Sequence, residues 1–281
     1  MRRLKGILRN PLAVVGAALL LAFLIMAAFA PALAPHDPTS QNLRARLLPP
    51  FWLEGGRPDY PLGTDQLGRD LLSRVLYGSR VAVMVAFGAT GLAMLIGVLL
   101  GLISGYFRGA LDTAIMRLVD IIVSVPNTIL YLTILALAGP SLPLLILVIG
   151  LLGWTTTARV IRSEVLSLGK REYVEASRAL GRREGATAFR HVLPNIMGSV
   201  IALGTLKASA TIIVESTLSY LGFGVQPPTL TWGQLLSQGQ QYVSTAWWLS
   251  TFPGIAITLL SLSLIFLGNW LRDLFDPRVV D

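Results

Sequence analysis

The sequence predicts an all-α protein, a polytopic membrane bundle of six transmembrane helices, and two observations support this prediction. First, the chain of 281 residues is 53% hydrophobic and only 14% charged, whereas about a quarter of the residues in a soluble domain are charged. Second, the charges leave long uncharged runs, at Leu12–Ala34, Val81–Phe107 and Ser216–Leu271. About 20 apolar residues suffice for a helix to cross a bilayer. These patterns exclude a soluble enzyme, a disordered chain and a nucleic-acid-binding domain.

The first expected helix covers Pro11–Ala34. It follows a short basic N-terminus, residues 1–10, with four lysine or arginine side chains. A cleaved signal peptide has a shorter apolar core and a small-residue cleavage site. We therefore expect this helix to be retained as a membrane anchor.

The residues between the first two crossings, 35–78, are expected to form an external segment. Within Thr64–Tyr77 the apolar residues share one side and the charged residues point elsewhere, which predicts an amphipathic helix that Gly78 ends. Either Thr64 or Asp65 can cap its first turn. We expect this helix to lie at the membrane surface and to hold the second crossing in place, rather than to contact a substrate.

The core transmembrane domain is expected to cover residues 79–271 and to begin with a second helix at Ser79–Tyr106. Small residues recur at every fourth position of this helix and so share one face: Ala89, Ala93, Gly97, Gly101 and Gly105. Such a face lets a neighbouring helix approach closely. We expect it to be a helix–helix contact.

Four further helices complete the predicted bundle. The uncharged stretch Ile121–Ala158 is too long for one crossing, and Gly139–Pro143 breaks it because proline lacks an amide donor and restricts the residue before it. The third to sixth helices are therefore expected at Leu111–Ala138, Pro143–Ile161, Asn195–Leu221 and Trp247–Leu271.

Lysine and arginine predict the orientation of the bundle, because they accumulate on the cytoplasmic side. Four lie in residues 1–10, eight in Arg159–Asn195 and two in the tail 272–281, whereas Gly222–Ala246 has none. The six arginines of residues 35–80 are nearly balanced by five acids, in a long segment where the rule is weaker. Both termini are therefore expected in the cytoplasm.

Charged residues inside the predicted crossings are few. Lys207 lies about midway along the fifth helix, and Glu215 lies nearer its outer end, about 80° away around the helix axis, so the two do not pair. Intramembrane charges face a bundle interior or a water-filled path. We expect a cavity or an interhelical partner for Lys207, and a path or a structural contact for Glu215. At the inner end of the third helix, Arg117 and Asp120 are spaced to pair locally.

The residue content argues against an enzyme. The two histidines, His36 and His191, are expected on opposite sides of the membrane, so they assemble neither a Ser–His pair nor a paired-His metal site. No cysteine is present. The residues around Lys170 are not a phosphate-binding loop, because Glu164 stands where that motif needs glycine and Arg171 follows the lysine. The chain has no visible means of hydrolysing ATP.

The cytoplasmic segment between the fourth and fifth helices, residues 170–195, is the most informative. Its first half predicts a short amphipathic helix that Gly181 ends, with an apolar face formed by Tyr173, Val174, Ala176, Ala179 and Leu180. A second short helical stretch leads to Pro194, near the start of the fifth helix. A helix of the first kind either lies on the lipid surface or docks in a groove of a partner protein, and the pattern alone does not choose.

This segment resembles the EAA loop in permease subunits of ABC importers. In that loop Glu-Ala-Ala, three residues, glycine, nine residues and Ile-x-Leu-Pro follow one another. Here Glu175-Ala176-Ser177, Gly181 and Leu193-Pro194 stand at the same spacing. Ser177 replaces the third alanine, and His191 replaces the isoleucine, a form similar to that of the peptide and nickel branch of the family.

Three further blocks resemble the second permease of dipeptide and oligopeptide importers in that branch. They are the outer segment Pro61–Arg74, the exit of the fifth helix at Glu215–Gly233, and the last helix with its tail at Trp247–Arg278. Asn269 stands where the branch often has aspartate. The four blocks occur in order and at fitting spacing over nearly the whole chain.

The resemblance implies a permease of a bacterial inner membrane, similar to the membrane domain of a type I ABC importer, that forms half of a translocation pathway for short peptides. It implies a homologous second permease, two ATPase subunits or domains that bind ATP and Mg²⁺, and an external solute-binding protein, with no cofactor on this chain. A short cytoplasmic coupling helix is expected to dock on an ATPase, Glu175 through polar contacts and Gly181 through turn geometry. The expected coupling residues are Glu172, Glu175, Ala176, Ser177, Arg178, Gly181, Leu193 and Pro194.

Other functions stay open from the sequence. The same architecture can import nickel or another small solute. A secondary transporter needs a coupling-ion site at broken helices near the midplane, and Lys207 is the only charge that is deep, which argues against that class. The loop Gly222–Ala246, with five glutamines, is an outer gate, a contact for a binding protein or a loop folded over the bundle. Lys207 and Glu215 are the candidate residues of a translocation path.

Overall fold

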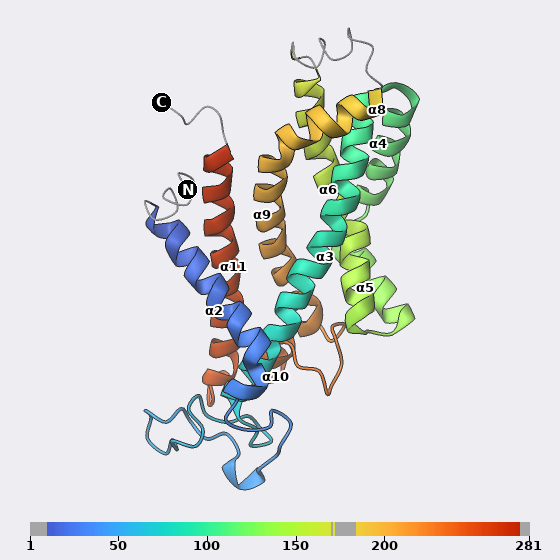
Figure 1. The fold of residues 1–281 in the computed structure, drawn as a ribbon. Coiled ribbons are helices and arrows are strands. Elements are labelled where there is room, and N and C mark those ends of the chain that lie inside the picture. Colours follow the sequence, from blue (N-terminus) through green and yellow to red (C-terminus); the bar gives the residue numbers. More distant parts are fainter. Residues whose placement is uncertain (1–9, 170, 172–183, 276–281) are drawn as a thin grey trace.

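The computed structural model describes residues 10–169, 171 and 184–275. All of its regular elements are helices, shown in Figure 1. The longer ones are α2 (Pro11–Leu33), α3 (Leu71–Phe107), α4 (Gly109–Val123), α5 (Asn127–Ala138), α6 (Leu142–Leu168), α9 (Leu193–Tyr220) and α11 (Trp248–Phe275). The shorter ones are η1 (Leu43–Ala45), α8 (Glu184–Thr187), the π-helix η2 (Ala188–Val192), α10 (Trp232–Gly239) and η3 (Gln240–Tyr242).

Six membrane crossings fit this arrangement. In the described part of the chain, five helical stretches are long and apolar enough to cross a bilayer, and α4 with α5 makes a sixth if the bent pair counts as one crossing. The start of α2 and the end of α11 lie at the same end of the bundle as α8, while α10 and residues 34–70 lie at the other end (Figure 1). We call these the α8 end and the α10 end.

The α2 helix begins where the sequence predicts. The side-chain oxygen of Asn10 accepts a hydrogen bond from the amide of Leu12 at 3.1 Å, and Pro11 occupies the first turn, where no amide donor is needed. Near the other end, Pro31 lies inside the helix, and Phe29 has non-helical backbone angles. Because proline removes one helical hydrogen bond, the helix bends there before it ends.

The predicted separate helix at Thr64–Tyr77 is wrong. The structure has one helix, α3, that begins at Leu71 and continues without a break through the predicted second crossing to Phe107. Neither predicted residue caps it. Its cap is Asp70, whose carboxylate accepts a hydrogen bond from the amide of Ser73 at 2.8 Å.

Gly78, which was predicted to end that helix, lies inside α3 for another reason. A Cβ atom at this position would lie 2.6 Å from Cδ1 of Trp232, so only glycine lets the indole pack against the helix. Trp232 is fully buried, donates a hydrogen bond to the carbonyl of Val75 at 2.9 Å and packs edge-on against Phe23. This contact holds α10 against the end of the bundle. The loop Gly222–Ala246, which contains α10 and which we call the glutamine-rich loop, is held there with it.

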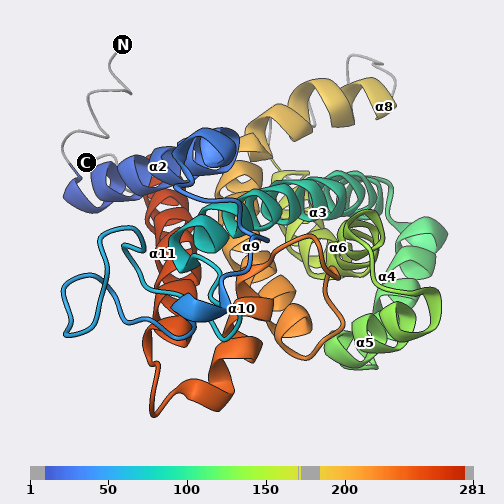
Figure 2. The same cartoon turned by 90° about the horizontal axis from the view of Figure 1, so that it is seen from below.

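The predicted small-residue contact is confirmed, and its partner is α6. All five small residues are buried. A Cβ atom on Gly97 would lie 2.5 Å from Cβ of Thr157, and one on Gly101 would lie 2.7 Å from the carbonyl oxygen of Ala158. Figures 1 and 2 show α3 and α6 side by side along most of their length. The contact is therefore backbone against backbone.

The predicted third helix at Leu111–Ala138 is not continuous in the structure. The chain forms α4 and α5, which are bent by 76° at a short break that contains Pro126. Proline has no amide to donate and keeps the preceding residue out of the helical region, which explains the break. The next break, before α6, lies where it was predicted: Gly139 has a φ of 82°, and Ser141 caps α6.

Candidate functional site

The coupling residues expected from the EAA resemblance fall into two groups. Leu193 and Pro194 are the first two residues of α9. The others lie outside the residues that the structure describes: Glu172, Glu175, Ala176, Ser177, Arg178 and Gly181. The structure therefore shows where the segment rejoins the bundle, at the α8 end.

The entry into α9 is helical, as predicted. The chain passes from α8 through the π-helix η2 into α9, and Pro194 lies in the first turn of α9. The side-chain amide of Asn195 donates a hydrogen bond to the carbonyl of His191 at 2.6 Å. The hydroxyl of Tyr106 donates to a carboxylate oxygen of Glu184 at 2.5 Å, which ties the end of α3 to α8. The start of the described chain after residue 183 is thus connected to both α3 and α9.

A groove runs between α6 and α9 toward the α8 end. Its cavity has a volume of about 210 Å³ and is lined by Val160, Glu164, Ser199, Ala202, Leu203, Leu206 and Arg272. The hydroxyl of Ser199 hydrogen-bonds the half-buried carboxylate of Glu164. The walls of the groove are mostly apolar, and its two charged lining residues are Glu164 and Arg272.

Lys207 lies at the midpoint of α9, next to this groove. Its side chain is half-buried and lies over Gly153 of α6, where a Cβ atom would be 3.5 Å from Cε and from Nζ of the lysine. The same Cβ atom would be 3.5 Å from Ala93 of α3. The lack of a side chain on Gly153 leaves room for the lysine chain between the helices.

Glu215 lies two turns farther along α9 and is sealed inside the subunit. Its side chain accepts a hydrogen bond from Ser219 at 2.6 Å and is reached by Ser216 at 3.3 Å, and only 1% of the residue is exposed. It does not contact Lys207, in agreement with the sequence analysis. These contacts fit the structural alternative, and its predicted place on a path stays a prediction.

The predicted local pair of Arg117 with Asp120 is wrong. Asp120 pairs with Arg159 of α6 at 2.6 Å, while Arg117 is exposed on α4. Two turns closer to the start of α4, both carboxylate oxygens of Asp112 are bound by Arg162, each at 2.6 Å. An arginine on a neighbouring helix competes with one at i,i+3 on the same helix for an aspartate. Here the arginines of α6 are better placed to bind the two carboxylates of α4.

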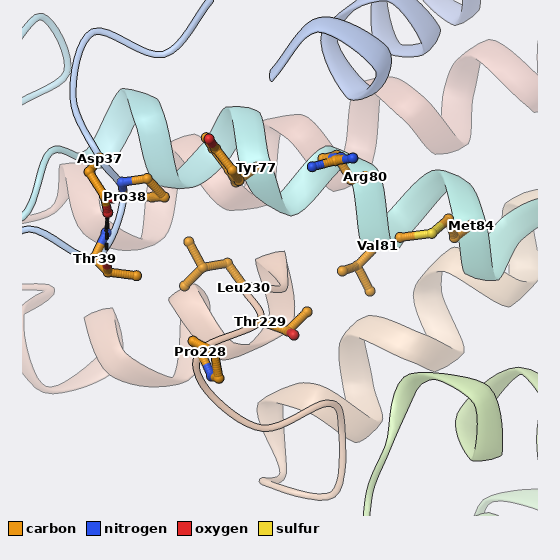
Figure 3. A pocket seen from close by; sticks show the side chains of 10 residues that line it. All are labelled: Asp37, Pro38, Thr39, Tyr77, Arg80, Val81, Met84, Pro228, Thr229 and Leu230. Atoms are coloured by element: carbon orange, nitrogen blue, oxygen red, sulfur yellow. Dashed lines mark hydrogen bonds between the residues drawn. The ribbon is translucent and has the colours of Figure 1, made fainter. Parts of the chain in front are cut away.

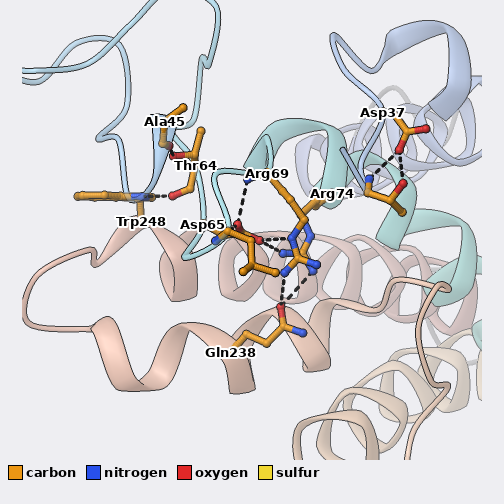
Figure 4. A network of polar contacts seen from close by, with 10 residues as sticks. Asp37, Ala45, Thr64, Asp65, Arg69, Arg74, Gln238 and Trp248 are labelled. Atoms are coloured by element: carbon orange, nitrogen blue, oxygen red, sulfur yellow. Dashed lines mark hydrogen bonds and ion pairs between the residues drawn. The ribbon is translucent and has the colours of Figure 1, made fainter. Parts of the chain in front are cut away.

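A buried polar network lies at the α10 end (Figure 4). Asp65 accepts from Arg69 at 2.7 Å and also pairs with Arg74, whose side chain is 1% exposed. Arg74 further donates to Oε1 of Gln238 at 3.0 Å. The network therefore joins the segment before α3, α3 itself and α10.

A second pair of contacts extends this network toward α11. Trp248 donates from Nε1 to the carbonyl of Thr64 at 3.3 Å, and the Thr64 hydroxyl donates to the carbonyl of Ala45 (Figure 4). Thr64 and Asp65, predicted as helix caps, instead hold a turn in place. The residues before α3 are thereby tied to the bundle at several points.

A pocket of about 350 Å³ opens beside the network at the α10 end (Figure 3). It lies between the residues after α2, the first turns of α3 and the loop before α10, and Tyr77, Arg80 and Leu230 are among its lining residues. Asp37, at its rim, is hydrogen-bonded by the amide and the hydroxyl of Thr39, which holds the pKa of this carboxyl below its usual range.

Comparison with known proteins assigns this helical bundle to a protein family. Residues 97–281 match the family described as the binding-protein-dependent transport system inner membrane component. This chain belongs to that family. Residues 2–50 of the permease also match the N-terminal transmembrane domain of oligopeptide transport permease C. The permease is accordingly a transport component and not an enzyme.

Curated relatives resemble the permease over nearly its whole length. It is 39% identical to the dipeptide transport system permease protein DppC of Haemophilus influenzae, over 96% of this chain and 92% of the relative. It is 38% identical to the di/tripeptide transport system permease protein DppC of Pseudomonas aeruginosa, over 94% and 87%. It is 36% identical to the probable D,D-dipeptide transport system permease protein DdpC of Escherichia coli, over 98% and 89%.

Sequence reasoning missed several polar residues of the permease that the structure brings together. Glu164 was considered only as a mismatch to a nucleotide motif. It lies seven and eleven residues from Thr157 and Gly153, and that helical spacing toward the α9 face was a usable signal. Gln238 belongs to the uncharged loop, where nothing in the sequence links it to Arg74.

Proposed function

We propose that this permease forms half of the translocation pathway of an ATP-driven importer of short peptides. The likeness to dipeptide permeases over nearly the full chain is the observation that carries the proposal. Four sequence blocks typical of this branch stand in order, and the groove between α6 and α9 offers a surface along which a small solute can pass. Peptides of two to a few residues are the proposed substrates.

The proposed assembly contains this chain, a homologous second permease, two ATPase subunits that bind ATP and Mg²⁺, and an external solute-binding protein. The family description names dependence on a binding protein. The EAA spacing supports docking of residues 170–195 on an ATPase. Because Tyr106 and Glu184 link the neighbourhood of that segment to α3, closure of the ATPases can change the relative positions of α3, α6 and α9.

The α8 end is proposed to face the cytoplasm of a bacterium, with both termini on that side. Eight lysine and arginine residues lie in Arg159–Asn195, and the loop Gly222–Ala246 at the α10 end has none. The α10 end then faces outward, where the binding protein docks. The pocket beside Tyr77 and the glutamine-rich loop both lie on that face.

Uptake by the reconstituted complex tests the proposal. The tagged permease is purified in mild detergent with the subunits that accompany it, and is placed in proteoliposomes that enclose ATP and Mg²⁺. We expect radiolabelled dialanine, added with the binding protein, to accumulate only when ATP is hydrolysed. Accumulation of Ni²⁺ but not of dialanine would move the permease to the nickel branch, and uptake without ATP would indicate a secondary transporter.

The coupling role of the EAA segment is tested by Gly181→Val. Valine disfavours the left-handed conformation, in which glycine ends a helix, by roughly 1–2 kcal/mol. We expect binding-protein-stimulated ATP hydrolysis and uptake to fall together, about tenfold, while Gly181→Ala has a smaller effect. Unchanged stimulation in an assembled Gly181→Val complex would contradict this role.

A further inference from the structure

Lys207 carries a charge that the described part of the chain does not neutralise. The acids of the neighbouring membrane helices are engaged elsewhere: Asp112 and Asp120 with arginines of α6, Glu164 with Ser199, and Glu215 with serines of its own helix. Within the described residues, Lys207 has neither a hydrogen bond nor an ion pair. A half-buried ammonium at mid-membrane depth needs a counter-charge or water.

The surroundings of Lys207 place it on the open side of the subunit. Ala210, Ile213 and Thr217 follow it at spacings of three, six and ten residues and are exposed, so they form one helical stripe at whose edge the lysine lies. Toward the α8 end, Leu206 and Leu203 continue this side of α9 into the cavity of the groove. The half-buried lysine therefore lies one turn beyond Leu203, next to the cavity but not among its lining residues, with its amine over the buried Gly153.

The chain supplies a matching row on α6. Val160 and Glu164 line the cavity and lie seven and eleven residues beyond Gly153, hence about two and three turns along the same face. Gly153 sits beneath the lysine, and Glu164 lies about 16 Å farther along the helix. A solute that moves through the groove toward the α8 end would pass Lys207 first, and then Glu164 and Arg272, which line the cavity together.

We propose that Lys207 binds the terminal carboxylate of the peptide as it crosses the membrane. This inference rests on the proposed function and names the chemistry of one contact within it. Every free peptide carries a terminal carboxylate, which loses hydration in the low dielectric between the helices, and an ammonium at the same depth compensates it. Lys207 is thus a substrate-binding residue of the path, and it recognises the C-terminal carboxylate of the peptide.

The alternative occupant is a carboxylate of the second permease, which would make Lys207 part of a subunit contact. Substrate binding and a subunit contact differ in which substrates need the charge of Lys207 for uptake. Substrate binding makes uptake of a peptide acid, but not of the corresponding amide, depend on the lysine. A subunit contact makes both substrates depend on it equally.

The experiment compares dialanine with alanyl-alaninamide, which lacks the carboxylate, in proteoliposomes that hold the complete transporter. The binding protein is saturated with each probe, as checked by equilibrium dialysis. For Lys207→Met we expect the uptake of dialanine to fall about tenfold, the size of loss typical for a charge-assisted hydrogen bond. Uptake of the amide should change little. Lys207→Arg should retain most of the preference for the acid, and Lys207→Glu should reverse it.

The matched control is Arg117→Met, which removes a positive charge from the exposed face of α4, outside the groove. It should leave the ratio of acid to amide uptake unchanged. An equal loss for both probes in Lys207→Met, or loss of the second permease during purification of that variant, would overturn the inference and assign Lys207 to a subunit contact. Failure of the wild-type complex to accumulate dialanine with ATP would instead refute the proposed function.

Discussion

At the scale of residues, Asp65 is the centre of the α10 end. It is the partner of both Arg69 and Arg74, and Arg74 is almost fully buried. Burying a guanidinium is costly unless a carboxylate compensates it. The aspartate therefore contributes less by its own attraction than by preventing an uncompensated charge beneath α10.

Replacement of Asp65 by asparagine tests this role. The variant leaves the buried Arg74 without its counter-charge, which costs about 3–5 kcal/mol. Gln238→Ala removes only a hydrogen bond at the edge of the network and should cost about 1 kcal/mol. Thermal unfolding of the purified complex, followed by tryptophan fluorescence, should show a much larger drop of the midpoint for Asp65→Asn. Equal shifts would show that the ion pair is not essential.

At the scale of elements, the contact between α3 and α6 sets the geometry of the groove. Lipid offers no hydrophobic drive for two helices to associate, so close van der Waals packing has to hold them. Gly97, Gly101 and Gly105 bring backbone against backbone, and Gly153, on the same side of α6, leaves room for Lys207 between α3, α6 and α9. The position of α6 is therefore decided by residues that have almost no side chain.

Gly97→Val tests this packing. Its side chain would overlap Thr157 and the carbonyl of Trp154, so α3 and α6 must separate, at a cost of about 1–3 kcal/mol. The matched control is Gly91→Ala in the same helix, where a Cβ atom meets nothing within 4 Å. We expect Gly97→Val to lower the unfolding midpoint and the uptake rate and Gly91→Ala to preserve both. A harmless Gly97→Val would contradict the close contact.

The two elements that sequence reasoning misjudged share a cause. The apolar face of Thr64–Tyr77 predicts a separate surface helix, but Asp70 caps a helix that continues through Gly78, and Trp232 fills the space beside the glycine. Within Leu111–Ala138, hydropathy is continuous across Pro126, so the bend of 76° leaves no mark in a hydropathy pattern. Hydrophobic periodicity therefore did not locate the helix boundaries. In the first case the boundary depends on the cap at Asp70, and in the second on the missing amide of Pro126.

At the scale of the whole molecule, the distribution of positive charge predicts which end faces the cytoplasm. The start of α2 and the end of α11 lie at the α8 end, as an even number of crossings requires (Figure 1). The native chain has no cysteine, so a single introduced thiol reports the exposure of one position without background.

Labelling of single-cysteine variants tests the orientation. Ser40 is exposed at the α10 end and Ser167 near the α8 end. Because positive residues stay on the cytoplasmic side, we expect a membrane-impermeant maleimide to label Ser40→Cys in intact cells and Ser167→Cys only after the membrane is opened. The reverse pattern would invert the proposed topology.

The sequence by itself determined the class of the protein, the number and approximate positions of its crossings, the face of α3 that packs against another helix, and the branch of permeases that it resembles. These properties depend on residues that are close together in the chain, since hydropathic length, charge clusters and motif spacing are local. Only the tertiary structure decided that α6 is the partner of α3, that Asp120 pairs with Arg159, and that Lys207 lies beside a groove lined by Glu164. Such contacts join distant segments, and they are fixed by which helices become neighbours and how closely small residues let them approach.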